Sequence, residues 1–184
     1  MQTNWSKSIP LLLVSEGSEL NINPPGTPAG QGEPGGGSRY GVSVAALSDL
    51  YKSRGLLPAT IQDIIDMTDV KAADFYQNVT AKAIRFDDLG VGVDYVMLDI
   101  TANLGPTGGL WLLQNVLGIW PVGNTISDLI VNLANKQDSK QLIYAIGAAW
   151  LSKKHESPGW IKSGHGWTNR MNRVRGDALA MSGV

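Results

Sequence analysis

Glutamate stands out in this sequence because it is scarce. Only four of the 16 acidic residues are glutamates, and three of these, Glu16, Glu19 and Glu33, fall within the first 33 residues. Glu16 closes an apolar run, where burial would favour a protonated carboxyl group. Cleavage of a glycosidic bond generally uses two carboxyl groups. One protonates the leaving oxygen, and the other activates water or stabilises the oxocarbenium-like transition state.

A segment rich in glycine and proline separates these glutamates from the rest of the chain. Residues 23–37 hold six glycines and four prolines, so they can form neither a helix nor a core. A flexible linker is one interpretation. However, the 22 residues before the segment are too few to fold alone. A long loop inside a compact domain is more often functional. We therefore expect an active-site loop whose bare backbone lets Glu33 approach a sugar.

The elements that must position these residues are predicted to be mainly α-helical. A short helix is expected to begin at a Ser8 cap, with Pro10 in its first turn, and to end at Glu16-Gly17. Residues 39–44 could add a small strand. Further helices are expected over 44–53, 60–65, 69–84 with Asp69 as its cap, 91–104, 110–117, 125–134, 139–153 and 168–180.

Composition excludes several classes of protein. A net charge of −1 gives no global field that would attract nucleic acid. The chain has no cysteine, and its two histidines lack an acidic companion at zinc spacing, so we expect no disulfide and no metal site. The apolar run over residues 9–14 is too short for a signal peptide or a membrane span. We therefore expect synthesis in the cytosol and no stable membrane insertion.

One segment departs from this even charge. Between Trp150 and Arg175 there are six basic residues, and Glu156 is the only acid. This excess could face an anionic polymer, or it could be a solvated helix face. The six are Lys153, Lys154, Lys162, Arg170, Arg173 and Arg175.

Four blocks of the sequence, in the same order, resemble glycoside hydrolase family 108. Residues 15–17 (SEG) and 33–43 (EPGGGSRYGVS) are similar to the family's Glu-Gly-Gly-Tyr, Asp-Pro-Gly-Gly and Tyr-Gly-Ile-Ser motifs. Residues 86–89 (FDDL) resemble its Asp-Asp-Leu-Pro stretch. The segments around Glu16 and Glu33 count as one block, and 86–89 is the second. The third, DITANLG at 99–105, resembles the family's Asn-containing helix, and the fourth, GHGWTNRMNRV at 164–174, resembles its closing Gly-Trp-x-Asn-Arg segment.

The resemblance implies a lysozyme-like catalytic part over residues 1–90 and a helical peptidoglycan-binding-like part over 91–184, packed together as one compact unit. Glu16 corresponds to the family's catalytic glutamate and Glu33 to its aspartate. Ser38 takes the place of a threonine that helps to orient the attacking water. The sequence departs from the family in its spacing, because 16 residues separate Glu16 from Glu33 where the family usually has eight.

Other residues have two interpretations each. Tyr40 could stack on a sugar or fill the core beneath the loop. Asn103 could contact substrate or bond backbone near the cleft. Asp99 lies in an apolar helix and is an alternative second carboxylate, or else a buried and satisfied polar group. Trp167 is expected to anchor the C-terminal helix rather than to bind sugar.

The function that the resemblance implies is that of a phage endolysin. It would hydrolyse the β-1,4 bond between N-acetylmuramic acid and N-acetylglucosamine in peptidoglycan, as a monomer and without a cofactor. It would be made in the host cytoplasm and reach the periplasm and cell wall through a holin-like membrane lesion, or travel in a virion. Two alternatives stay open. One is a lytic transglycosylase that uses Glu16 alone, and the other is a non-catalytic wall-binding or secretion-assisting protein of the same fold.

Overall fold

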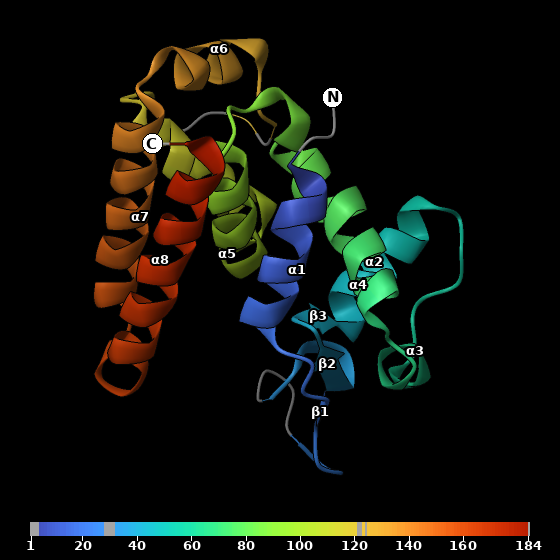
Figure 1. The fold of residues 1–184 in the computed structure, drawn as a ribbon. Coiled ribbons are helices and arrows are strands. Elements are labelled where there is room, and N and C mark those ends of the chain that lie inside the picture. Colours follow the sequence, from blue (N-terminus) through green and yellow to red (C-terminus); the bar gives the residue numbers. More distant parts are fainter. Residues whose placement is uncertain (1–3, 28–31, 121–122, 124, 184) are drawn as a thin grey trace. The chain divides into compact units, whose positions relative to one another are not determined.

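The computed structural model describes residues 4–27, 32–120, 123 and 125–183. Within these residues the chain forms eight α-helices and one small antiparallel sheet (Figure 1). The predicted fold class, mainly α with a small β element, is confirmed. No helix in the described ranges is long and apolar enough to cross a membrane.

The chain divides into two compact units. We call Met1–Ser8 together with Thr80–Val184 the helical unit, and Ile9–Val79 the hairpin unit. The first helix, α1 (Trp5–Glu16), begins in the helical unit and ends in the hairpin unit.

The hairpin unit is built on a three-stranded sheet with the order β1-β2-β3. Strand β2 (Gly37–Arg39) pairs antiparallel with β1 (Asn21–Ile22) on one side and with β3 (Val42–Ser43) on the other. The predicted strand is thus a tight hairpin whose turn is Tyr40-Gly41. The Gly/Pro-rich segment is the connection from β1 to β2, and it ends in the short helix η1 (Pro34–Gly36).

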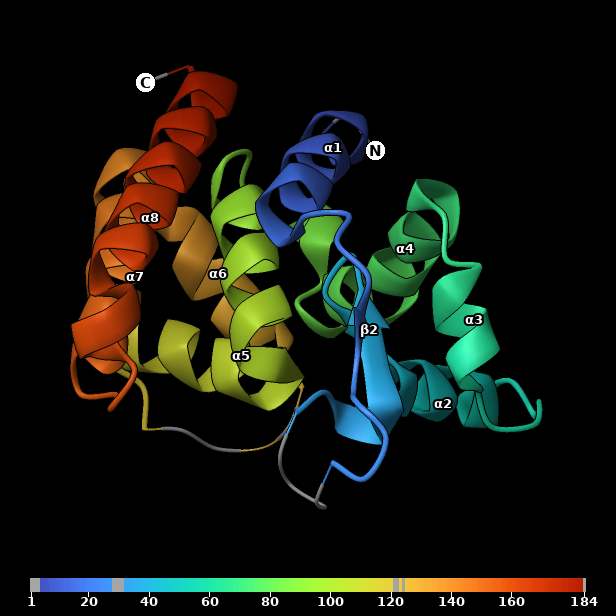
Figure 2. The same cartoon turned by 90° about the horizontal axis from the view of Figure 1, so that it is seen from below.

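Three helices lie to one side of β2 (Figure 2). The first, α2 (Val44–Ser53), follows β3 directly because the Ser43 hydroxyl accepts the amide of Ala46. A capping box between Thr60 and Asp63 opens α3 (Ile61–Ile65). Both starts are as predicted. The third helix, α4 (Asp69–Tyr76), is capped by the Thr68 hydroxyl rather than by Asp69, and it continues into the π-helical turn η2 (Gln77–Ala81).

The helical unit is a packed group of long helices. Helices α7 (Ser139–His155) and α8 (Trp160–Ser182) lie side by side, and α5 (Val93–Val116) packs against both (Figure 1). The shorter elements are η3 (Phe86–Asp88) and α6 (Asp128–Lys136). The core consists of fully buried side chains, which include Tyr95, Met97, Leu98, Ile100, Leu113, Ile143 and Trp150.

The start of α1 differs from its prediction. The carbonyl of Asn4 accepts the amides of Lys7 and Ser8, so the first turn closes before Ser8 and Pro10 lies inside the helix. Asn4 holds this position because its side-chain amide donates to both oxygens of buried Asp94, at 2.8 and 3.0 Å. Sequence reasoning placed the cap too late because this long-range partner has no local signal.

Two glycine-containing segments also differ from their prediction. The helices expected over 91–104 and 110–117 form one helix, α5, with a kink at Gly105 (φ 74°, ψ 166°), just before Pro106. Helix α8 begins at Trp160 rather than at 168. Its Gly164 allows the Trp160 ring to pack closely, since a Cβ at 164 would be 2.8 Å from that ring.

Candidate active site

The carboxyl group of Glu16 lies against the β2–β3 turn. Glu16 is half-buried and is the last residue of α1. A Cβ at residue 41 would be 2.5 Å from Glu16 Oε2 and 3.1 Å from its Cδ. Real Cβ contacts are essentially never below 3.0 Å, so a side chain at residue 41 would force the carboxyl group of Glu16 to shift.

The backbone of the turn is unusual at Tyr40. Both turn residues have positive φ, 51° at Tyr40 and 73° at Gly41. Such a pair forms the type I′ turn that matches the twist of a hairpin. A bulky residue in the left-handed region costs about 1–2 kcal/mol. A hydrogen bond compensates, because the Tyr76 hydroxyl donates to the Tyr40 carbonyl at 2.8 Å.

Tyr76 brings a second oxygen to the same place. It is the last residue of α4 and is 2% exposed. Its hydroxyl oxygen also lies 2.5 Å from the point that a Cβ on residue 41 would occupy. Two side-chain oxygens, Glu16 Oε2 and the Tyr76 hydroxyl, therefore lie close to the same point beside Gly41. Sequence reasoning missed Tyr76, whose one available signal, an aromatic residue inside the helix predicted over 69–84, is equally typical of a core position.

Arg39 fixes the segments around the turn. Its Nε donates to the Ser18 carbonyl at 3.3 Å, and its Nη1 donates to the Ile65 carbonyl at 2.9 Å. Its guanidinium also lies over the Tyr40 ring, 5.6 Å from the centroid. Arg39 thereby joins the residues that follow α1 to the end of α3 and to the turn.

Glu33 is held through its main chain. The Asn23 side chain donates to the Glu33 carbonyl at 2.8 Å and accepts the Glu33 amide at 2.6 Å. The Asn23 amide donates to the Gly36 carbonyl at 3.0 Å. These bonds close the base of the loop, so half-buried Glu33 is anchored next to the end of β1 despite the long spacing from Glu16. Residues 28–31 of the loop lie outside the described residues.

The remaining candidates divide between the two units. Ser38 is buried in β2, opposite Asn21 and Ser43. The hairpin unit therefore holds Glu16, Glu33, Ser38 and Tyr40. Asn103 is exposed on α5, in the helical unit.

Asp99 is buried and paired in the helical unit. It is 0% exposed, and its two oxygens accept Nε and Nη2 of Arg170 at 3.1 and 3.0 Å. Burial raises the pKa of Asp99, and the Arg170 guanidinium opposes that shift. Of its two interpretations, the structure agrees with the satisfied polar group, here one that joins α5 to α8.

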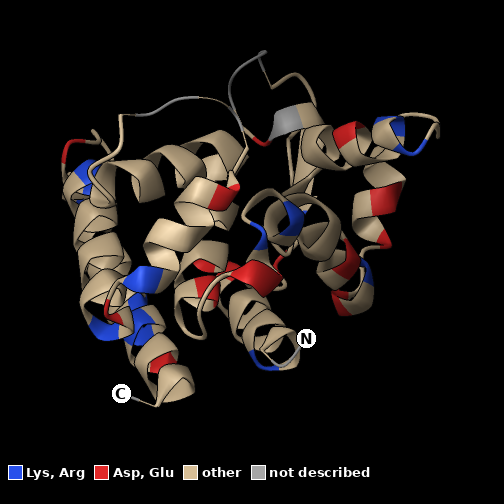
Figure 3. Cartoon of the chain, turned by 90° about the horizontal axis from the view of Figure 1, so that it is seen from above, with Lys and Arg blue, Asp and Glu red and all other residues tan. Residues whose placement is uncertain are grey.

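The basic residues of the 150–175 segment lie on α7 and α8 (Figure 3). Two of them are structural. Arg170 pairs with Asp99, and the Lys154 ammonium lies over the rings of Trp150 and Trp167, at 5.3 and 4.8 Å. Burial lowers the pKa of Lys154. Three others, Lys153, Lys162 and Arg173, are exposed.

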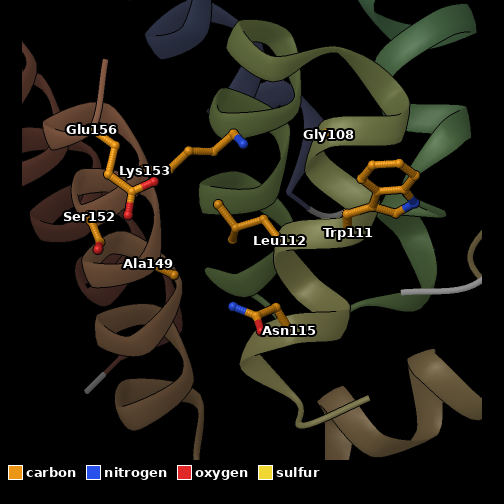
Figure 4. A pocket seen from close by; sticks show the side chains of 8 residues that line it. All are labelled: Gly108, Trp111, Leu112, Asn115, Ala149, Ser152, Lys153 and Glu156. Atoms are coloured by element: carbon orange, nitrogen blue, oxygen red, sulfur yellow. The ribbon is translucent and has the colours of Figure 1, made fainter. Parts of the chain in front are cut away.

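A groove of about 350 Å³ in the helical unit is lined by residues of α5 and of the end of α7 (Figure 4). Leu112 and Ala149 give it apolar walls, and Trp111, which is 49% exposed, lies on the α5 side. Lys153 in α7 and Glu156, just after the end of α7, supply opposite charges. The hollow next to it shares Trp111 and includes exposed Trp120. In the described part of the chain, no group of three histidine or carboxylate side chains could hold a metal ion.

Comparison with known proteins supports the family resemblance. Residues 23–105 match the family Glycosyl hydrolase 108. Eight chains of solved structures match, among them the structure of Brucella abortus SagA. That chain is 26% identical, with a TM-score of 0.82 over 99% of this chain and 97% of its own length. No curated protein matches. The resemblance predicted from the sequence is thus confirmed over residues 23–105, which match the glycoside hydrolase 108 family.

Proposed function

We propose that this glycoside hydrolase cleaves peptidoglycan at the β-1,4 bond between N-acetylmuramic acid and N-acetylglucosamine, with Glu16 as its general acid. The observation that carries the proposal is the location of Glu16. Its half-buried carboxyl group lies at a helix end, against a turn where the positive φ of Gly41 and the closeness of the carboxyl group favour glycine. Such partial burial favours a protonated carboxyl group, which the leaving oxygen requires.

In the proposed reaction Glu16 gives its proton to the glycosidic oxygen as the bond from that oxygen to the anomeric carbon breaks. A water molecule attacks the resulting oxocarbenium-like centre and loses a proton to the Glu33 carboxylate, while the Ser38 hydroxyl orients that water. A water-activating, inverting mechanism needs carboxyl groups about 6.5–9.5 Å apart. The Asn23 anchor supports a role for Glu33, because it fixes the Glu33 backbone at the base of the loop.

The groove of the helical unit is proposed as a contact for the cell wall. An exposed indole beside hydroxyl, amide and charged groups suits a sugar, whose apolar face stacks on a ring while its hydroxyls bond at the edge. Trp111→Ala should then reduce sedimentation of the protein with insoluble peptidoglycan without changing its unfolding midpoint. Unchanged sedimentation would contradict this role.

In the cell we propose an endolysin that acts as a monomer. It would accumulate in the host cytoplasm and act on the wall after a holin-like lesion opens the membrane. Within the described residues, no helix is suited to span a membrane, so a separate lesion would be consistent with this route.

The experiment is product analysis by mass spectrometry on purified peptidoglycan. Hydrolysis with reducing muramic ends is the expected result. Products with 1,6-anhydromuramic ends would replace the proposal with a lytic transglycosylase that uses Glu16 alone. Wall that is bound but not cleaved would leave the non-catalytic alternative.

A further inference from the structure

We propose that Tyr76 is a positioning residue for Glu16, whose hydroxyl oxygen holds the Glu16 carboxyl group in its protonated form. The inference rests on the proposed role of Glu16 as the general acid. It concerns a residue outside the set that the family resemblance carries over, and it follows from two contacts at the β2–β3 turn.

The first contact fixes the direction of the Tyr76 hydroxyl. A phenol hydroxyl has one proton to donate and lone pairs that accept. The proton of Tyr76 points to the Tyr40 carbonyl, 2.8 Å away. That carbonyl belongs to a turn residue with positive φ, so the turn and the hydrogen bond stabilise each other.

The second contact brings the same oxygen toward Glu16. Both the Tyr76 oxygen and Glu16 Oε2 lie 2.5 Å from the Cβ position of residue 41, so the two oxygens are no more than twice that distance apart. Because the Tyr76 proton is donated to the Tyr40 carbonyl, the hydroxyl can offer Glu16 a lone pair. A lone pair can accept the proton of a neutral carboxyl group, but it repels a carboxylate. Tyr76 therefore favours the neutral acid.

The surroundings preserve this effect. Tyr76 is 2% exposed, so water has little access to its hydroxyl. Arg39 in β2 is a charged neighbour of the turn, and a cation favours the carboxylate. Its guanidinium is engaged by the carbonyls of Ser18 and Ile65 and by the Tyr40 ring.

The test compares wild type with Tyr76→Phe, which removes only the hydroxyl. We expect the basic limb of the pH profile of wall hydrolysis to move to lower pH by about one unit. Activity at the acidic plateau should change much less than activity at pH 7. A purely structural role would lower activity at every pH alike, and that result would overturn the proposal. Tyr51→Phe is the matched control, since the Tyr51 hydroxyl donates to Asp63 in the same unit, and it should leave the limb in place.

A second measurement does not depend on catalysis. The chain has only four glutamates, so ¹³C-labelled glutamate gives four carboxyl resonances, and Glu16→Gln identifies one of them. In the wild-type protein the Glu16 resonance should titrate at higher pH than the other three, and in Tyr76→Phe it should move toward them. A Glu16 titration that coincides with the others in the wild type overturns the proposal even if Tyr76→Phe does not fold. A protein without hydrolase activity that still shows the shifted titration would reject the proposed function alone.

Discussion

The carboxyl group of Glu16 and the α-carbon of Gly41 are so close that a methyl group on the latter would be 2.5 Å from Glu16 Oε2. The end of α1 and the β2–β3 turn, 25 positions apart in the sequence, are therefore positioned against each other. The same turn accepts a hydrogen bond from Tyr76. A side chain added at Gly41 would therefore be expected to act on the proposed acid directly, through the contact with Glu16 Oε2.

Gly41→Ala should reduce wall hydrolysis by about 10²-fold, the loss typical of a catalytic group displaced by about 1 Å. The added methyl group must displace Glu16 or the Tyr76 hydroxyl. Gly55→Ala is the control, because Gly55 has a similar φ of 71° but open space around its Cβ position. Both variants should lose about 1–2 kcal/mol of stability from backbone strain. Equal losses of activity in the two would contradict the contact.

Asn23→Ala should reduce hydrolysis while changing the unfolding midpoint little. The substitution removes the two bonds that hold the Glu33 main chain, so a second carboxylate at Glu33 would lose its fixed position. Thr27→Ala is a suitable control, because Thr27 is in the same loop and its hydroxyl bonds only the nearby Pro24 carbonyl. If Asn23→Ala keeps full activity, Glu33 is not the second carboxylate or does not need this anchor.

Local sequence signals predicted the element starts that depend on nearby residues. The helix starts at Ser43 and Thr60 were predicted because each hydroxyl accepts an amide only three positions away. Of the hairpin, only a small strand over 39–44 was predicted. The start of α1 was not, because Asn4 is held by Asp94, 90 positions away. The start of α8 was placed too late, at 168, because the sequence does not show that Trp160 packs against Gly164 inside the helix.

The candidate site follows the same rule. Glu16 and the turn could be predicted from the residue types and the family motif. Tyr76 and the Asn23 anchor could not. In the sequence, Asn23 is simply a polar residue in a loop. Its structural role comes from two hydrogen bonds to the main chain of Glu33, ten positions away. Tyr76 acts through a carbonyl 36 positions away, a relation that no local pattern reports.

Replacing Asp99 and Glu33 by their amides should have opposite effects on stability and activity. Asp99→Asn weakens a fully buried pair with Arg170, so it should cost about 1–3 kcal/mol of stability, and the folded protein should keep most of its activity. Glu33→Gln should do the reverse, with activity lost and stability kept. Urea unfolding and wall-clearing rates measure both. The opposite pattern would make Asp99 the second carboxylate.

Asp94 should make stability depend on pH. Burial raises its pKa to about 6 from the usual 3.8, against hydrogen bonds from Tyr95, Asn4 and Gly92. The folded state then binds the proton more tightly than the unfolded state. Its contribution is complete below about pH 4 and is lost as pH rises through about 6, a change of about 3 kcal/mol. Urea unfolding at several pH values should show this decline, and Asp94→Asn should flatten it. Asp49→Asn, at an exposed site in α2, is the control and should leave the decline unchanged. An unchanged decline in Asp94→Asn would exclude Asp94 as its source.

The central claim is that Glu16 supplies the proton, and Glu16→Gln tests it most directly. An amide keeps the shape of the side chain but cannot donate that proton, and loss of a general acid typically costs about 10²-fold or more. The measurement is the rate of release of reducing ends from purified peptidoglycan by wild type and Glu16→Gln, with thermal unfolding of both. We predict a loss of at least about 10²-fold with an unchanged unfolding midpoint. A folded Glu16→Gln protein that keeps more than about a tenth of the wild-type rate would contradict the account.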